Sequence, residues 1–163
     1  MVPARFAVAM IEHKWYLRSE IIWEKPSCKP EKADDRPSAT HEKVYMFTKS
    51  QRYKYDKETA ASIGAHRTVW RINPSQGAVT MDGEPVPAAF PEELVERCLL
   101  PSTEPGDRVL DPFAGSGTTV AVAEQWGRVG VGTDLTDRWF PPHRSRSAPG
   151  PDHQDQGVQL VFP

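Results

Sequence analysis

The residues whose types and spacing best suit chemistry lie between Asp111 and Thr119, in the run DPFAGSGTT. The residues RVL before this run favour a short buried strand, and the residues from Thr118 to Trp126 favour an apolar helix. At such a junction the helix start offers unpaired N–H groups, and glycines let a ligand approach the backbone where a Cβ would collide. This pattern predicts a loop that binds a nucleotide-like ligand.

Two common phosphate-binding loops fit the run poorly. The NTPase loop requires a lysine followed by serine or threonine after its second glycine, but Gly117 is followed directly by Thr118. The dinucleotide fingerprint requires a third small residue where Val120 stands, and this loop begins with the acid Asp111. The NTPase loop is therefore excluded, and a dinucleotide enzyme stays a weak alternative. A tight turn whose glycines serve packing alone is the other alternative.

Two carboxylates narrow the choice of ligand. Asp111 ends the first predicted strand, where a carboxylate repels pyrophosphate but accepts hydrogen bonds from an ammonium group. Asp134 lies seventeen residues after Gly117, at the end of the next predicted strand. Its carboxylate is placed to accept hydrogen bonds from both hydroxyls of a ribose. An adenosine with a positively charged amino-acid tail satisfies both acids. The pattern therefore indicates S-adenosylmethionine.

The elements that must position this loop are predicted from periodicity and from proline and glycine stops. A helix is expected in FPEELVERCLLP, beginning at Pro91 and ending before Pro101. Strands are expected over residues 108–110 and 129–132, joined by the apolar helix that Gly127 ends in a left-handed conformation. Together these elements predict a right-handed βαβ unit with parallel strands.

The N-terminal half gives weaker signals, and the C-terminal end gives almost none. A helix is compatible with residues 2–13, and aromatic and branched residues predict strands over 15–23 and 42–48. Residues 50–87 are expected to be irregular. Residues 141–157 carry proline, serine and charge without apolar periodicity, so they are expected to be disordered.

The sequence LDPFAGSGTT followed by GVGTDL resembles motifs I and II of the S-adenosylmethionine-dependent DNA methyltransferases that modify adenine N6 or cytosine N4. AAFPEELVERCLL looks like motif X of that family, with Phe90 as the aromatic that contacts the cofactor. Motif X directly before motif I resembles the permuted beta class, and WYLRSEIIWEKP, DRPSATHEKVYMFTKS and RYKYD also resemble that class. The likeness covers about residues 1–137.

The resemblance implies an α/β fold: an incomplete Rossmann-like methyltransferase, with a βαβ cofactor unit, the last strands of the sheet and a disordered C-terminal tail. The family's sheet has the order 3-2-1-4-5-7-6, and this chain is expected to carry strands 1, 2, 6 and 7. The implied cofactor-binding residues are Phe90, Asp111, Phe113, Gly115, Gly117, Thr118 and Asp134. The implied segments are the last strands of the catalytic half (1–50), an irregular or partial target-recognition segment (51–87), the cofactor unit (88–137) and the tail (138–163).

The sequence departs from the family at its catalytic motif, which is Asp or Ser followed by Pro-Pro and an aromatic. No such tetrad occurs here, because Asp111 belongs to motif I and the run Phe140-Pro141-Pro142-His143 has the wrong order. No catalytic residue is therefore assigned. The chain is expected to be the C-terminal portion of a DNA methyltransferase of a restriction-modification system, completed by an upstream polypeptide. The alternative is a non-catalytic cofactor- or DNA-binding module completed by a separate chain. A second departure is Val86, which stands near the position where the family usually has His before its Ala-x-Phe-Pro.

Composition limits the other function classes. The 163 residues have a net charge of −2 and no apolar run near 18 residues, so neither a membrane span nor a signal peptide is expected. Cys28 and Cys98 stand seventy positions apart, which argues against a disulfide framework or a zinc site, and no metal is expected. A cytoplasmic location is expected.

Charge is divided unevenly along the chain. Residues 1–60 carry 12 lysines and arginines against 9 acids, whereas the remainder carries 8 against 13. A solvated face explains this as well as a surface that meets DNA phosphate does. A group of aromatic and basic residues stacks on DNA or forms a small satellite core: Tyr53, Tyr55, Arg67, Trp70 and Arg71.

Overall fold

The computed structural model describes residues 2–27, 34–75, 89–135 and 158–161. The chain divides into two compact units. Unit 1 consists of residues 1–73 together with 154–163, and unit 2 consists of residues 74–153.

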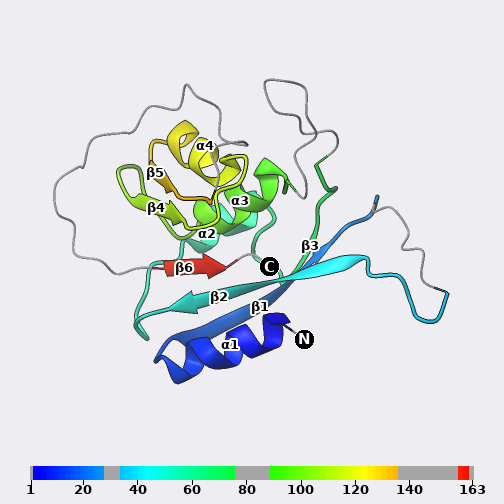
Figure 1. The fold of residues 1–163 in the computed structure, drawn as a ribbon. Coiled ribbons are helices and arrows are strands. Elements are labelled where there is room, and N and C mark those ends of the chain that lie inside the picture. The colour runs from blue at the N-terminus through cyan, green and yellow to red at the C-terminus, as the bar shows by residue number, and fades with distance from the viewer. Residues whose placement is uncertain (1, 28–33, 76–88, 136–157, 162–163) are drawn as a thin grey trace. The chain divides into compact units, whose positions relative to one another are not determined.

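Unit 1 begins with helix α1 (Val2–Glu12), which lies against the strands that follow it (Figure 1). Ala7 is the buried residue of the helix, and it joins a core cluster with Tyr45 and Phe47. The ring of Phe6 meets Phe47 edge-on, with centroids 6.4 Å apart. The helix ends where Lys14 takes a left-handed conformation, with φ of 66°. The predicted helix over residues 2–13 is confirmed.

The sheet of unit 1 has the strand order β3-β1-β2-β6. Strands β1 (Tyr16–Glu24) and β2 (His41–Thr48) pair antiparallel along their full length, with one register shift between Leu17 and Ser19. Both strands were expected from their aromatic and branched residues, and both are confirmed. All residues from Val44 to Thr48 are buried, so this part of β2 is covered on both faces of the sheet.

The expectation of an irregular segment over residues 50–87 is wrong for part of its length. Helix α2 (Lys57–Ser62) begins where the Asp56 carboxylate accepts the N–H groups of the first turn. Strand β3 (Val69–Arg71) pairs parallel to β1 and sets Trp70 opposite Trp23. Both elements are too short to give a periodic signal in the sequence. Residues 76–88 lie outside the described residues.

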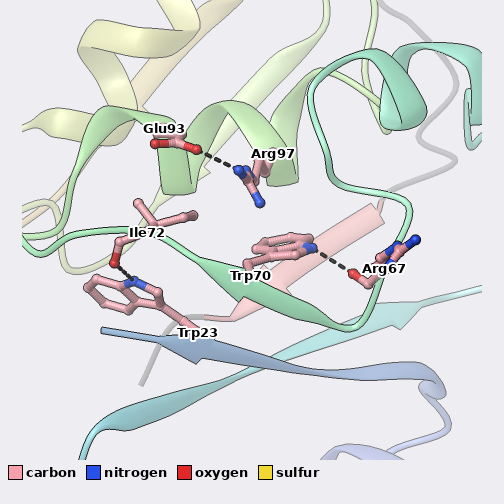
Figure 2. Close-up of polar contacts among 6 residues, drawn as sticks. All are labelled: Trp23, Arg67, Trp70, Ile72, Glu93 and Arg97. Carbon is pink, nitrogen blue, oxygen red and sulfur yellow. Dashed lines mark hydrogen bonds and ion pairs between the residues drawn. The ribbon is translucent and has the colours of Figure 1, made fainter. Parts of the chain in front are cut away.

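Two indole groups fix β3 against its surroundings in unit 1. The Nε1 of Trp23 donates to the carbonyl of Ile72 at 2.9 Å, and the Nε1 of Trp70 donates to the carbonyl of Arg67 at 2.6 Å (Figure 2). Both side chains are almost fully buried, so a bonded indole N–H avoids the cost of a buried donor without a partner. These bonds hold a three-residue strand that pairing alone would leave marginal.

The expectation of a disordered tail over residues 138–163 is wrong at residues 158–161. Strand β6 (Val158–Val161) pairs antiparallel with β2, from Thr48 opposite Val158 to Tyr45 opposite Val161. A physical reason is that the run VQLV is rich in branched residues and meets the edge of β2 that β1 leaves open. The rest of the predicted tail lies outside the described residues.

Unit 2 contains helix α3 (Glu92–Leu99), strand β4 (Arg108–Asp111), helix α4 (Thr118–Gln125) and strand β5 (Val129–Gly132). Strands β4 and β5 pair parallel, from Arg108 opposite Val129 to Asp111 opposite Gly132. The two helices bury a shared cluster composed of Val95, Leu99, Val122 and Ala123. The expected βαβ unit and the α/β fold class are therefore confirmed.

Polar contacts and one glycine set the geometry of unit 2. Trp126 donates its indole N–H to Glu96 at 3.0 Å, which links the end of α4 to α3, and Arg97 pairs with Glu93 along α3 (Figure 2). A Cβ on Gly130 would stand 2.8 Å from the backbone oxygen of Val120. Strand β5 and helix α4 therefore approach so closely that only glycine fits at position 130.

Candidate functional site

The candidate site is the glycine loop, residues 112–117, which joins β4 to α4. Gly115 and Gly117 have φ of +49° and +75°, in the left-handed region that L side chains rarely adopt. Gly117 is the N-cap of α4 and, as a glycine, has no side chain of its own to cap that helix start. Its N–H donates to the carbonyl of Ala114 at 2.7 Å, which closes a tight turn. The positive φ values give a backbone reason for glycine at both positions, and the predicted approach of a ligand there stays a prediction.

The glycine loop is fastened to the exit of strand β5. Asp134 accepts the N–H of Gly115 on Oδ2 at 2.9 Å. Thr133 donates its N–H to the carbonyl of Asp111 at 3.0 Å and accepts the N–H of Ala114 at 2.9 Å. The sequence predicted that Asp111, Gly115 and Asp134 lie near one another, and the structure brings these residues together at the carboxyl ends of two parallel strands.

Asp111 also shapes the loop that it opens. Its Oδ1 accepts the N–H of Phe113 at 3.0 Å, so the carboxylate folds back over the first turn of the loop. Phe113 itself is 85% exposed, although a phenyl ring is usually buried in a folded protein. An exposed ring beside two carboxylates and a glycine turn supplies an apolar surface on which a flat ligand group can pack.

The space and the polar groups at the loop suit a ligand. A Cβ built on Gly115 would meet no atom within 4 Å, so the space beside this glycine is open. The N–H of Ser116 donates to no atom of the described residues, and the hydroxyls of Ser116 and Thr118 lie 3.0 Å apart. The Oγ1 of Thr119 is buried and has no partner within the part of the chain that the structure describes. These residues fit a ligand that carries several polar atoms, and S-adenosylmethionine is such a ligand.

Phe90 has different surroundings from the residues of the glycine loop. It is half-buried before the start of α3 and packs against the core cluster that α3 and α4 share. Its predicted contact with the methionine end of the cofactor stays a prediction. The cofactor-binding role expected for Thr118, the first residue of α4, also stays a prediction.

Three residues around the loop were not found by sequence reasoning: Ser116, Thr119 and Thr133. Thr133 adds a third link to the loop, because its hydroxyl donates to the carbonyl of Pro112 at 3.0 Å. Thr133 stands inside the run GVGTDL, but nothing in that run pointed to a role for its hydroxyl, which follows only from the geometry. Ser116 stands inside the predicted motif, but its type gave no reason to single it out.

The aromatic and basic residues of the N-terminal half are divided between core and surface. Trp70 is buried, so it belongs to the core of unit 1 and does not stack on DNA. The Arg18 guanidinium lies 4.8 Å from the ring centre of Tyr53 and 5.3 Å from that of Tyr16. Arg71 forms an ion pair with Glu24 at 3.2 Å. Trp70 therefore lies apart from the exposed members of the group, whose contact with DNA stays a prediction.

Metal-binding clusters and membrane-spanning helices are both absent from the described residues. Those residues contain no cluster of three or more histidines, cysteines or acids that could hold a metal ion. None of their helices is long and apolar enough to cross a membrane.

Comparison with known sequences identifies the family. The profile of the family described as DNA methylase, N6 and N4, matches residues 3–140. The type II methyltransferase M.Cfr9I of Citrobacter freundii is 44% identical over 146 residues, which cover 85% of this chain and 46% of that protein. M.SmaI of Serratia marcescens is 39% identical over 150 residues, which cover 85% and 48%. The chain therefore spans about half the length of these curated relatives.

Solved structures give the same result. The PvuII DNA methyltransferase, described as cytosine-N4-specific, matches with a TM-score of 0.72 and 25% identity, over 88% of this chain and 58% of that chain. A DNA modification methylase of Thermus thermophilus, solved in complex with S-adenosyl-L-methionine, matches with a TM-score of 0.61 and 27% identity, over 85% and 55%. Because the family profile covers well over half of its residues, this chain belongs to the DNA methylase family.

Proposed function

We propose that this chain provides the S-adenosylmethionine-binding part of a DNA methyltransferase that acts on adenine N6 or cytosine N4. The observation that carries the proposal is the hydrogen bond from Gly115 to Asp134, which joins the glycine loop to the acid at the end of the next parallel strand. Membership of the DNA methylase family and the likeness to a structure with bound S-adenosyl-L-methionine support it.

The loop residues have distinct roles in this proposal. Asp134 accepts hydrogen bonds from the ribose hydroxyls, while its Oδ2 accepts the N–H of Gly115. Asp111 faces the positively charged end of the cofactor. Gly115 and Gly117 let the ligand approach the backbone, and Phe113, Phe90 and Thr118 complete the contacts. When bound, the cofactor supplies an electrophilic methyl group on its sulfonium. This chain contributes binding and orientation.

We propose that the acceptor half of the reaction is supplied by residues other than these 163. The sequence contains no Asp/Ser-Pro-Pro-aromatic tetrad, and the chain spans about half the length of its curated relatives. A target base must be flipped out and held about 3 Å from the donor, which requires groups that grip the base. A non-catalytic cofactor- or DNA-binding module is the second candidate, and the missing tetrad is the observation that favours it.

The ligand assignment is tested by calorimetry. S-adenosylhomocysteine, the demethylated product, should bind the chain more tightly than NAD does. Asp134→Ala should weaken binding by about 1 to 3 kcal/mol, because the ribose loses its acceptor and Gly115 loses its anchor. Asp35→Ala removes an exposed carboxylate of unit 1 and is the matched control, which should leave binding unchanged. Equal affinity for NAD, or an Asp134→Ala variant that binds like the wild type, would contradict the assignment.

The division of the reaction is tested with a labelled methyl donor. The purified chain should transfer no measurable label to duplex or single-stranded DNA. A polypeptide that carries the tetrad and the missing strands, taken from the upstream half of a relative such as M.Cfr9I, should restore transfer when added. Robust methylation by the chain alone would show that another of its segments replaces the tetrad.

A further inference from the structure

We propose that Thr133 is a positioning residue that holds the glycine loop in the shape that presents its free N–H group to the ligand. The proposal concerns the same loop as the proposed function and rests on it where the ligand is S-adenosylmethionine. Thr133 lies directly after strand β5, inside the run GVGTDL, but it was not among the residues expected to bind the cofactor.

Thr133 contacts three successive parts of the loop entrance. Its N–H donates to the carbonyl of Asp111, its hydroxyl donates to the carbonyl of Pro112, and its carbonyl accepts the N–H of Ala114, at 3.0, 3.0 and 2.9 Å. The two backbone bonds could be made by any residue except proline. The hydroxyl bond depends on the side chain, so position 133 requires Thr or Ser for the full set.

The bonds around Thr133 decide which loop amides are already engaged. Phe113 donates to Asp111, Ala114 to Thr133, Gly115 to Asp134 and Gly117 to Ala114, whereas Pro112 has no N–H. The remaining amide of the loop is that of Ser116, which donates to no atom of the described residues. The clamp at Thr133 therefore leaves the Ser116 N–H, next to the start of α4, for an acceptor atom of the ligand.

The exposure of Thr133 allows its role in ligand binding to be distinguished from a role in the stability of the fold. Its side chain is exposed, so loss of the hydroxyl leaves the Pro112 carbonyl accessible to water and buries no unpaired group. The fold should therefore survive a Thr133→Val substitution, while the loop gains conformations that do not present the amide of Ser116. The expected effect is on ligand affinity and on local amide exchange.

The test compares three variants of the full chain: Thr133→Val, Thr133→Ser and Thr68→Val. Thr133→Val keeps the shape and removes the donor, Thr133→Ser restores the donor, and Thr68→Val makes the same change at an exposed position of unit 1. Two measurements are made on each variant, the Kd for S-adenosylhomocysteine by calorimetry and the exchange rates of the Ala114 and Gly115 amides by NMR.

Thr133→Val should raise the Kd about threefold to tenfold and accelerate exchange at Ala114 and Gly115, with the thermal midpoint unchanged. Thr133→Ser should return both values to within twofold of the wild type, and Thr68→Val should change neither. Wild-type affinity and exchange in Thr133→Val would overturn the proposal. If the wild type does not bind S-adenosylhomocysteine, the proposed function fails, and unaltered exchange in Thr133→Val then separately overturns the clamp.

Discussion

Units 1 and 2 use their sheets in different ways. In unit 1 the residues from Val44 to Thr48 are buried on both faces of β2, and two indole N–H groups find carbonyl partners. In unit 2 the paired residues Leu110 and Val131 remain 65% and 44% exposed, whereas Val109 packs against the helices. Both units bury a side-chain core, and unit 2 adds a close strand-to-helix approach and a loop fixed by backbone hydrogen bonds.

This difference between the two sheets indicates which unit has groups available for a ligand. The stretch from Val44 to Thr48, which is buried on both faces, leaves few side chains for a ligand, whereas the strand ends of unit 2 offer N–H groups, carboxylates and an exposed ring. Substitutions in unit 1 should therefore change the free energy of unfolding. Substitutions at the strand ends of unit 2 should change affinity with little effect on folding.

The largest expected effect comes from a matched pair of phenylalanines. Phe47→Ala removes a fully buried ring that packs against Phe6 and Tyr45, so the free energy of unfolding of unit 1 should fall by about 3 to 5 kcal/mol. Phe113→Ala removes a ring that is almost wholly exposed and should leave stability unchanged. Amide exchange, followed separately for residues of each unit, measures both changes.

Equal changes in stability for the two phenylalanine variants would contradict the proposed difference between the units. A large loss of stability in Phe113→Ala would mean that the exposed ring has a packing partner in solution. A small loss in Phe47→Ala would mean that the core around β2 repacks without the ring.

A second pair tests the close approach in unit 2. Gly130→Ala places a Cβ within 3 Å of three atoms of Val120, two of them backbone, so unit 2 should lose about 3 kcal/mol. Gly106→Ala enters open space, and its positive φ of 93° alone should cost about 1 to 2 kcal/mol. Chemical denaturation, followed at the indole N–H of Trp126 by NMR, reports on unit 2. If Gly130→Ala costs no more than Gly106→Ala, β5 and α4 are free to move apart.

The smallest expected effect is a pH dependence in unit 1. Hydrogen bonds from the hydroxyl and the N–H of Thr59 lower the pKa of Asp56, the N-cap of α2. Because the folded-state pKa lies below the unfolded value, the contribution is complete above the unfolded pKa and is lost as the pH falls through the folded pKa. The thermal midpoints of wild type and Asp56→Asn should therefore converge on acidification from about pH 6 to about pH 2. A difference that stays constant over this range would contradict the carboxylate's role.

Much of unit 2 was predictable, because its signals are local. Helix boundaries were marked by Pro91, Pro101 and Gly127. The binding loop was predicted from the acids at the ends of two short strands. The link between Asp134 and Gly115 was not predictable in detail, although the proximity of the residues was. Thr133 was missed because its hydroxyl acts through a carbonyl twenty-one residues earlier in the chain.

Unit 1 was less predictable, because its remaining elements depend on distant partners. Strand β3 has three residues and exists through its pairing with β1 and the buried Trp70. Strand β6 has no periodicity of its own and depends on the edge of β2. A short strand that is stabilised by a neighbour far away in the chain leaves no pattern in a local window.

The pairing of β6 with β2 has a consequence for synthesis on the ribosome. Thr48 pairs with Val158, so the two strands are separated by the whole of unit 2 in the order of translation. Unit 2 can fold as soon as its own residues emerge, whereas the edge of β2 stays open until the residues of β6 leave the exit tunnel. Completion of unit 1 is therefore a late event that closes a long loop, and the interval before it is when the nascent chain is most exposed to strand exchange with another polypeptide.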